Sequence, residues 1–252
     1  MSYPILEFDP TREAFIEPSR VIQPRDFPEH CVICFFGEVL EKIVRQHNAK
    51  TLVEINWESG PHRVYEIEHQ GKRLAFFHPG VGAPLAAGLL EEVIAFGSRK
   101  FIACGGCGVL ERDIAVGNLV VVSGAVRDEG VSYHYLPPSR EVFAQPAGIA
   151  ALENALRARG LPHRQGKAWT TDAVYRETPA KIAARRAEGC CVVEMEASAL
   201  IAVAQFRQVT FGQVLYGGDD LSGADWDNRD WQSRTQIRES LFWLSAEACL
   251  AL

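Results

Sequence analysis

The chain has 252 residues and a mass of 27.9 kDa, a length at which one α/β domain buries a substantial core. Its content of 47% hydrophobic and 23% charged residues is typical of globular proteins and argues against disorder and fibrous repeats. The formal net charge of −6 opposes a polyanion-binding surface, because neutralising a phosphate backbone needs clustered lysines and arginines. We therefore expect no nucleic-acid partner, whereas an anionic small substrate needs only one or two local arginines.

The cysteines and the apolar runs indicate in which cellular compartment the protein is expected. Seven cysteines, an odd number, lie mostly inside apolar runs and follow no secretory leader, which predicts a reducing, cytoplasmic compartment. The spacing of Cys104 and Cys107 could serve metal or redox chemistry, but no second ligand pair accompanies it, and we expect no metal site. The sequence contains no apolar run of about 18 residues, so no membrane-spanning helix is predicted.

The first thirty residues contain five prolines and no sustained periodicity, so residues 1–30 are predicted to form an extended arm. From residue 31 onward, apolar β-rich runs alternate with helical patterns. Strands are predicted at 31–36, 51–57, 63–69, 73–78 and 100–105, with helices at 37–47 and 83–97. Further strands are predicted at 118–126, 163–171, 190–195 and 208–218, and further helices at 147–159, 179–188, 196–206 and 231–250. The segment 127–145 is rich in turn formers.

This alternation predicts an α/β fold. Runs such as residues 119–126 are apolar on both faces, which suits a mostly parallel sheet covered by helices on each side. In such sheets ligands bind at the carboxyl ends of the strands. We therefore predict one domain spanning residues 1–252, with function in the loops that follow strands. Trp226 and Trp231 are expected to pack the last helix against the domain.

Two glycine-rich turns follow predicted strands. The segment His78-Pro-Gly-Val-Gly82 ends one strand and opens a helix, so its backbone amides could receive an anion or a sugar hydroxyl. The segment Cys104–Gly108, which contains Gly106, follows the next strand in the same way. The alternatives are a tight strand-to-helix connection for the first segment and close backbone packing for the second.

Acidic residues lie at the ends of two further apolar strands. Glu194 and Glu196 flank Met195 where a strand becomes a helix, and burying them without a partner would be costly. Glu196 is the stronger candidate for a ligand such as a pair of ribose hydroxyls, and for Glu194 a structural carboxylate at the helix start is favoured. Asp219 and Asp220 end another strand. One of them could cap a turn and the other could hold a proton for a leaving group, and the sequence leaves their roles open.

Taken together, these segments resemble the class I nucleoside phosphorylases, a family of purine nucleoside and uridine phosphorylases with related nucleosidases. The resemblance covers most of the chain, and the order and spacing of its parts are more specific than any one part. The matching segments are Glu17-Pro-Ser-Arg20 in place of an N-terminal GDPxR element, Gly80-Val-Gly82, the run KFIACGGCG, Glu194-Met195-Glu196 and Gly218-Asp219. The resemblance implies a three-layer α/β/α sandwich around a twisted mixed sheet. It also implies a homo-oligomer (dimer, trimer or hexamer) in which a neighbour completes each site.

The resemblance further implies roles for individual residues. Asp219 would protonate the leaving base, and Met195 and Glu196 would bind the ribose. The implied phosphate-binding residues are Arg20, Gly82, Gly106 and Arg63. The implied base-binding residues are Val174, Tyr175, Arg176 and Glu194. The partners would be a nucleoside and phosphate, which acts as a co-substrate, and no cofactor is implied.

The chain departs from the family pattern where phosphate should bind. Ala103 stands where phosphorylases often carry an arginine, and Gly106 stands where a hydroxyl side chain is usual. Val174 likewise replaces a common phenylalanine. A charge-assisted contact is worth about 1.5–3 kcal/mol, so phosphate binding is weakened unless another arginine compensates: Arg20, Arg63 or Arg176.

The expected activity is phosphorolysis of a purine or uridine-type nucleoside to the free base and ribose 1-phosphate. A purine is favoured, because an acid at Asp219 suits a purine nitrogen. A nucleosidase that uses water and a catalytically silent nucleoside-binding protein are the alternatives. Intact Glu196 and Asp219 argue against the silent protein.

Overall fold

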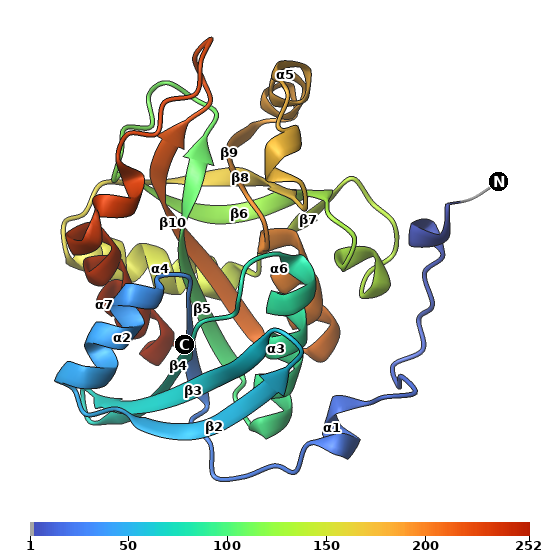
Figure 1. The fold of residues 1–252 in the computed structure, drawn as a ribbon, viewed down its shortest axis with the longest axis vertical. Coiled ribbons are helices and arrows are strands. Elements are labelled where there is room, and N and C mark those ends of the chain that lie inside the picture. The colour runs from blue at the N-terminus through green and yellow to red at the C-terminus, as the bar shows by residue number, and fades with distance from the viewer. Residues whose placement is uncertain (1–2) are drawn as a thin grey trace.

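The computed structural model describes residues 3–252 and contains a ten-stranded mixed sheet with helices on both faces (Figure 1). The strands are β1 (His30–Cys34), β2 (Lys50–Trp57), β3 (Gly60–His69), β4 (Lys72–Phe77), β5 (Lys100–Val109), β6 (Leu119–Asp128), β7 (Glu141–Phe143), β8 (His163–Thr171), β9 (Cys190–Glu194) and β10 (Thr210–Asp220). Their order is β10-β6-β8-β9-β5-β1-β4-β3-β2, with β7 beside β6. The predicted α/β fold around a mixed sheet is confirmed.

Seven α-helices are assigned within residues 3–252: α1 (Pro18–Val21), α2 (Gly37–Gln46), α3 (Ala83–Phe96), α4 (Pro146–Ala158), α5 (Pro179–Ala187), α6 (Ala197–Arg207) and α7 (Thr235–Leu250). The short 3-10 helices are η1 (Pro4–Leu6), η2 (Ser132–His134), η3 (Val174–Arg176) and η4 (Trp231–Ser233). Buried residues of α3 and α6 form one apolar cluster with the sheet, and those of α2, α4 and α7 form a second. In the part of the chain described, no helix has the length and apolar character needed to cross a bilayer.

The sheet brings three strand ends to one place. β5 runs parallel to both β1 and β10, with Gly106 opposite Tyr216 in the latter pair. The end of β5 also pairs antiparallel with β9, where Gly108 lies opposite Val193. Because β10 pairs with β6 as well as β5, the strands β5, β10, β6, β8 and β9 form a closed ring. The residues that follow β9 and β10 therefore lie around the end of β5.

The glycine-rich segment 104–108 differs from its prediction as a turn, because it continues strand β5 to Val109. Its glycines are needed for close packing. A Cβ atom at Gly106 would lie 3.2 Å from the Tyr216 ring, and one at Gly108 would lie 2.6 Å from Leu221. The alternative interpretation of this segment, close backbone packing, is therefore correct.

The N-terminal arm lies along the outside of the molecule (Figure 1). Its helix α1 contacts α3, and the Phe27 ring stacks on Phe96 at the end of α3 with 5.6 Å between centroids. Residues 1 and 2, which the arm prediction included, lie outside the described residues. The arm thus joins β1 after packing along one face of α3.

Candidate active site

Glu196 and the first glycine turn meet directly. Glu196 precedes α6, and its Oε1 accepts a hydrogen bond from the Gly82 backbone N–H at 2.5 Å. Gly82 has a φ of 93°, a conformation that glycine adopts without strain, and it precedes α3. Burial raises the pKa of Glu196 above the ordinary carboxyl range, and the negative charge of Glu194 adds to this shift. The predicted sugar-binding carboxylate thus lies against the start of α3.

Glu194 has a different environment from its neighbour. Its carboxylate accepts hydrogen bonds from Thr170 Oγ1 at 2.6 Å and from the backbone N–H groups of Glu196 at 2.8 Å and Ala197 at 2.7 Å. Burial raises its pKa, and these hydrogen bonds oppose the shift. Both oxygens are therefore used to hold the start of α6. These contacts support a structural role for Glu194 at the start of α6, and its implied contact with a base stays a prediction.

A buried hydrogen-bond network lies behind these two carboxylates. Thr170 Oγ1 also accepts the Ser198 N–H at 3.0 Å, and Ser198 Oγ donates to Glu129 Oε1 at 2.9 Å. Nearby, the Gly130 N–H donates to Asp172 Oδ2 at 2.9 Å. The network links the ends of β6 and β8 to the start of α6. It therefore fixes the loop after β8, which contains the predicted base-binding residues, relative to Glu194.

Asp219 lies at the end of β10, between the end of β5 and the loop that follows β10. Its Oδ2 accepts a hydrogen bond from the Trp226 Nε1–H at 2.7 Å. Its Oδ1 is on the side of Gly108, where a Cβ atom would lie 3.6 Å away. Glu177 is close enough that the Asp219 charge, after burial, helps to raise the Glu177 pKa to about 7. Asp219 thus interacts with Trp226 through a hydrogen bond and with Glu177 through its charge.

Asp220 serves the loop after β10. Its carboxylate accepts the Ser222 N–H at 2.7 Å and forms an ion pair with Arg229. Its backbone pairs in both directions with Asp227. Burial opposes the shift, but the Ser222 hydrogen bonds and the Arg229 charge lower the pKa of Asp220. The structure therefore separates the two aspartates, which the sequence left open.

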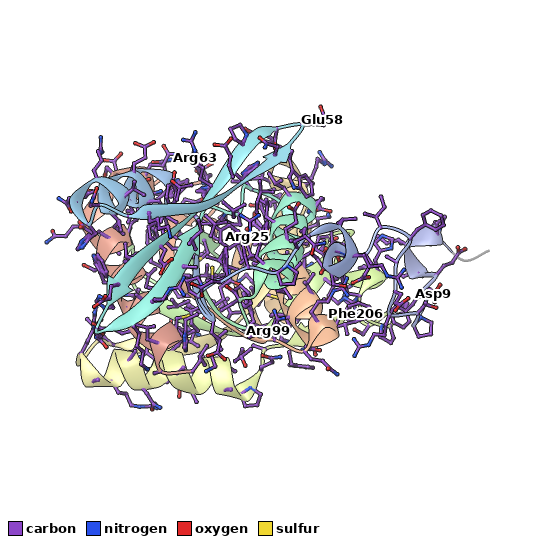
Figure 2. The ribbon with its side chains drawn as sticks, turned by 90° about the horizontal axis from the view of Figure 1, so that it is seen from below. Asp9, Arg25, Glu58, Arg63, Arg99 and Phe206 are labelled. Atoms are coloured by element: carbon purple, nitrogen blue, oxygen red, sulfur yellow. The ribbon has the colours of Figure 1, made fainter. Side chains whose placement is uncertain are left out.

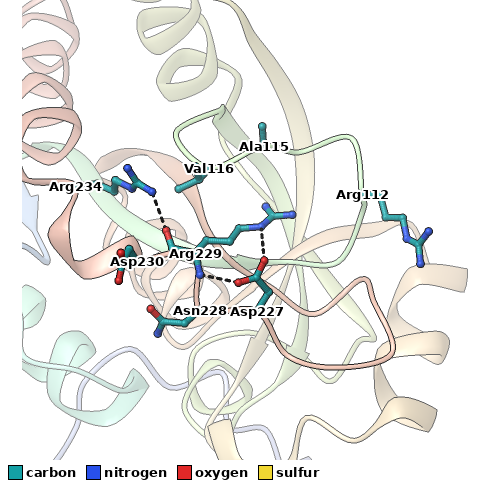
Figure 3. A pocket seen from close by; sticks show the side chains of 8 residues that line it. All are labelled: Arg112, Ala115, Val116, Asp227, Asn228, Arg229, Asp230 and Arg234. Atoms are coloured by element: carbon teal, nitrogen blue, oxygen red, sulfur yellow. Dashed lines mark hydrogen bonds and ion pairs between the residues drawn. The ribbon is translucent and has the colours of Figure 1, made fainter.

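The loop after β10 also borders a shallow pocket of about 690 Å³ (Figure 3). The residues that line it are Arg112, Ala115, Val116, Asp227, Asn228, Arg229, Asp230 and Arg234. Figure 3 shows Arg229 and Asp227 facing each other across the loop, and the Arg229 N–H donates to Asp227 Oδ1 at 3.0 Å. These contacts fix the segment that carries Trp226.

The two tryptophans before α7 differ from each other. Trp231 packs against the apolar cluster that contains buried α7 residues, as predicted. Trp226 is 62% exposed and contacts Asp219 instead. The prediction that Trp226 packs the last helix was wrong, because the pairing of Asp220 with Asp227 turns the chain back toward the end of β10.

The two arginines expected to bind phosphate lie elsewhere. Arg20, in α1, pairs with Glu13, and its side chain is 63% exposed. Arg63, in β3, pairs with Glu54 at 2.9 Å and lies at the rim of the molecule (Figure 2). Neither contacts Gly82 or Gly106 within this chain. The phosphate assignments of Arg20 and Arg63 are therefore not met by this protomer, since each side chain extends into solvent.

A segment that was not predicted from the sequence lies beside the two glycine-rich segments. It is the connection from β1 to α2, residues 35–38. The Phe35 N–H donates to the Cys104 carbonyl at 3.1 Å, and the Phe35 ring is 6.3 Å from the His78 ring. A Cβ atom at Gly37 would lie 3.9 Å from the His78 ring. A loop directly after the first strand of the sheet was the available signal for this position.

This connection contains an acid rather than a base. Glu38 pairs with Arg238 of α7 at 3.0 Å, and the Arg238 guanidinium lies 4.6 Å from the Phe36 ring centroid. Ala103 and Gly106, on the neighbouring strand, contribute no charged side chain. Arg238 is the cation that the structure places beside the start of α2, and Glu38 already neutralises it.

The loop after β8 presents the implied base-binding residues to solvent. Val174 is 46% exposed and Tyr175 is 95% exposed, both in η3, and Arg176 is exposed as well. Met195, between the two glutamates, is partly buried. The contact of the η3 residues with a base stays a prediction. Tyr175, however, makes no ring contact with the rest of the described chain.

The cysteine pair of β5 is part of the core. Cys104 and Cys107 are buried free thiols, and Cys107 Sγ donates to the Tyr216 carbonyl at 3.3 Å. Burial raises the pKa of Cys107 well above its usual value. Both thiols therefore serve packing between β5 and its neighbours.

The fold and this site define a mixed α/β protein with carboxylates gathered where β5, β9 and β10 end. The chain belongs to the phosphorylase superfamily, whose family model matches residues 29–242. It is 26% identical over 196 residues to a guanosine phosphorylase of Halorubrum lacusprofundi, covering 78% of this chain and 80% of the relative. It is also 26% identical over 172 residues to a uridine phosphorylase of Thermococcus kodakarensis, covering 65% of this chain and 62% of the relative.

Solved structures show the same fold. A purine nucleoside phosphorylase from Toxoplasma gondii in complex with immucillin-H superposes with a TM-score of 0.76 at 21% identity, over 94% of this chain and 97% of that one. An AMP nucleosidase from Bacteroides thetaiotaomicron superposes with a TM-score of 0.73 at 20% identity, over 90% and 89% of the two chains. At these identities the likeness establishes the architecture.

Proposed function

We propose that this chain cleaves the N-glycosidic bond of a purine nucleoside, with inorganic phosphate as acceptor, to give the free base and ribose 1-phosphate. The observation that carries the proposal is that β9, which precedes Glu196, and β10, which ends in Asp219 and Asp220, both pair with the end of β5. Gly108 of β5 pairs with β9, just before Glu196, and lies against Asp219. A carboxylate suited to sugar hydroxyls and an acid suited to a base thus flank one short segment.

The chemistry follows from where charge develops. As the bond from the ribose C1′ to the base breaks, its electrons move to the base, and the sugar becomes positively charged. Asp219 donates a proton to a ring nitrogen of the leaving base, and an oxygen of phosphate bonds to C1′. Glu196 binds the ribose hydroxyls and Met195 packs under the ring, which holds C1′ in place.

The phosphate would lie at the start of α3. A Cβ atom at Gly82 would have no heavy atom within 4 Å, so there is space beside this residue, and a helix N-terminus favours an anion. The relatives that carry phosphorylase names support this acceptor. A cation is still needed to neutralise phosphate, and a neighbouring subunit of a homo-oligomer is the proposed source.

Water is the second candidate acceptor, and one observation favours it. The positions nearest the glycine-rich segments contain Ala103, Gly106 and the paired Glu38, so residues 3–252 offer phosphate no unpaired cation there. A nucleosidase needs the groups that bind ribose and base, but it needs no arginine for phosphate.

The test is base release from adenosine, guanosine, inosine and uridine, with and without phosphate, with identification of the sugar product. Ribose 1-phosphate formed only with phosphate supports the proposal. Free ribose at a phosphate-independent rate supports the nucleosidase instead. Binding without release of any base from these nucleosides would indicate a catalytically silent protein, and Glu196→Gln should abolish that binding.

A further inference from the structure

Trp226 is an exposed aromatic residue attached to the proposed acid. Its indole N–H donates to Asp219 Oδ2 at 2.7 Å, although the side chain is 62% exposed. An indole has a large apolar face and a single N–H donor. Here the N–H is used by Asp219, and the rest of the ring remains available to a ligand.

The backbone beside Trp226 is firmly held. The Asp220 N–H donates to the Asp227 carbonyl at 2.8 Å, and the Asp227 N–H donates back at 3.0 Å. Arg229 pairs with Asp220 and also donates to the Ile114 carbonyl at 2.9 Å. The segment 221–226 is thus closed at its base by contacts that fix the position of the indole. The hydrogen bond between Trp226 and Asp219 is therefore supported by the backbone contacts of this loop.

The loop after β8 lacks a large ring near Asp219, the proposed acid. Val174 is small, and Tyr175 of η3 is 95% exposed and makes no ring contact within residues 3–252. Glu177, which follows η3, is the member of that loop whose pKa responds to the Asp219 charge. A base at Asp219 would therefore meet the Glu177 carboxyl group from this side.

We propose that Trp226 is a base-contacting residue, whose indole packs against the nucleobase that receives the Asp219 proton. This inference rests on the proposed function. An atom hydrogen-bonded to Asp219 lies within about 8 Å of Nε1, so a bicyclic base in that position reaches the indole. Contact between a base and an aromatic ring stabilises binding irrespective of base sequence, because every base has a π-face.

The same hydrogen bond orients the acid. An indole N–H can donate but cannot accept, so a proton on Oδ2 of Asp219 is disfavoured in its presence. A proton that Asp219 delivers in the proposed reaction would therefore leave from Oδ1, the oxygen on the side of Gly108. Trp226 therefore has two separable effects, one through its ring and one through its N–H.

Two variants separate these effects. Trp226→Phe keeps an aromatic ring and removes the N–H, and Trp226→Ala removes both. With the best nucleoside of the panel, we expect Trp226→Ala to raise KM about tenfold. We expect Trp226→Phe to lower kcat several-fold with KM within twofold of the wild-type value. Phe143→Ala, which removes an exposed ring from β7, is the matched control and should leave both constants unchanged.

Tryptophan fluorescence gives a readout besides activity. Titration of the wild-type protein with hypoxanthine should change the emission, and the change should be lost in Trp226→Phe. A KM for Trp226→Ala within twofold of wild type, or an unaltered fluorescence change in Trp226→Phe, would overturn the inference. Failure of the proposed function is distinguishable, because it is read from the wild-type protein alone, which would then release either no base or free ribose without phosphate.

Discussion

Adjacent residues at the end of β10 have separate tasks. Asp219 is the proposed proton donor, and Asp220 holds the following loop through Ser222 and Arg229. We expect Asp219→Asn to lower kcat about 100-fold or more with little change in thermal stability, because a positioned acid typically contributes that much. Asp220→Asn should lower the melting temperature and retain more turnover. Steady-state kinetics and thermal unfolding of both variants check this, and the reverse pattern would exchange the two roles.

The raised pKa of Glu177 predicts that the stability of the protein depends on pH. Its pKa is raised from 4.5 to about 7 by burial and by the Asp219 charge. Between pH 4.5 and about pH 7, Glu177 keeps its proton in the folded protein but has lost it in the unfolded chain. The free energy of unfolding therefore falls as pH rises through this range. Glu177→Gln removes this dependence.

We expect the Glu177→Gln variant to match the wild type near pH 4 and to melt a few degrees higher at pH 8. Melting temperatures measured across this range for both proteins provide the test. Curves that run parallel at every pH would show that Glu177 does not retain its proton in the fold.

At the scale of elements, the start of α6 depends on residues from other strands. Thr170 of β8 donates to Glu194 and accepts from Ser198. Thr170→Val keeps the shape but leaves buried polar groups unpaired, which should cost about 1–3 kcal/mol of unfolding free energy. We also expect a higher KM, because Glu196 follows the disturbed turn.

Thr51→Val is the matched control, since Thr51 lies exposed on strand β2. Chemical denaturation and kinetics of both threonine variants measure the difference. Equal stability of the two variants would mean that the network contributes nothing to the position of Glu194.

The elements themselves were largely predictable. Helices 37–47 and 83–97 were predicted to within a residue of α2 and α3 because apolar periodicity is a local property. Strand β7 and η2, in the segment 127–145, were missed, because a strand of three residues has no periodicity to detect. The glycines of β5 were assigned to a turn, since their need for close contact with Tyr216 and Leu221 arises only across the sheet.

At the scale of the whole molecule, we expect a homo-oligomer. The arm exposes the apolar side chains of Phe15, Ile16 and Val21. A groove of about 680 Å³ between the arm and α3 adds further apolar surface, including Trp57. Exposed apolar surface of this kind is typical of protein interfaces.

Light scattering should therefore give a mass above the 27.9 kDa of one chain. Ile16→Glu should shift the protein toward the monomer and lower its activity with phosphate, if a neighbour supplies the missing cation. Leu161→Glu, in the connection between α4 and β8, is the control and should change neither property. A fully active wild-type monomer would contradict both the assembly and the shared site.

The sequence by itself determined the α/β class, most helices and strands, and the acids that end two strands, because these depend on local patterns of apolar and polar residues. It could not determine which atoms those acids bind. The contacts of Gly82 with Glu196, Thr170 with Glu194, and Gly108 with Asp219 join residues far apart in the chain.

Only the tertiary structure decided which groups Glu194 binds, that Arg20 and Arg63 face solvent, and that the Trp226 N–H donates to Asp219. The physical reason is that hydrogen bonds and ion pairs act over a few ångströms. The packing of the sheet sets those distances, and spacing along the chain does not reveal them.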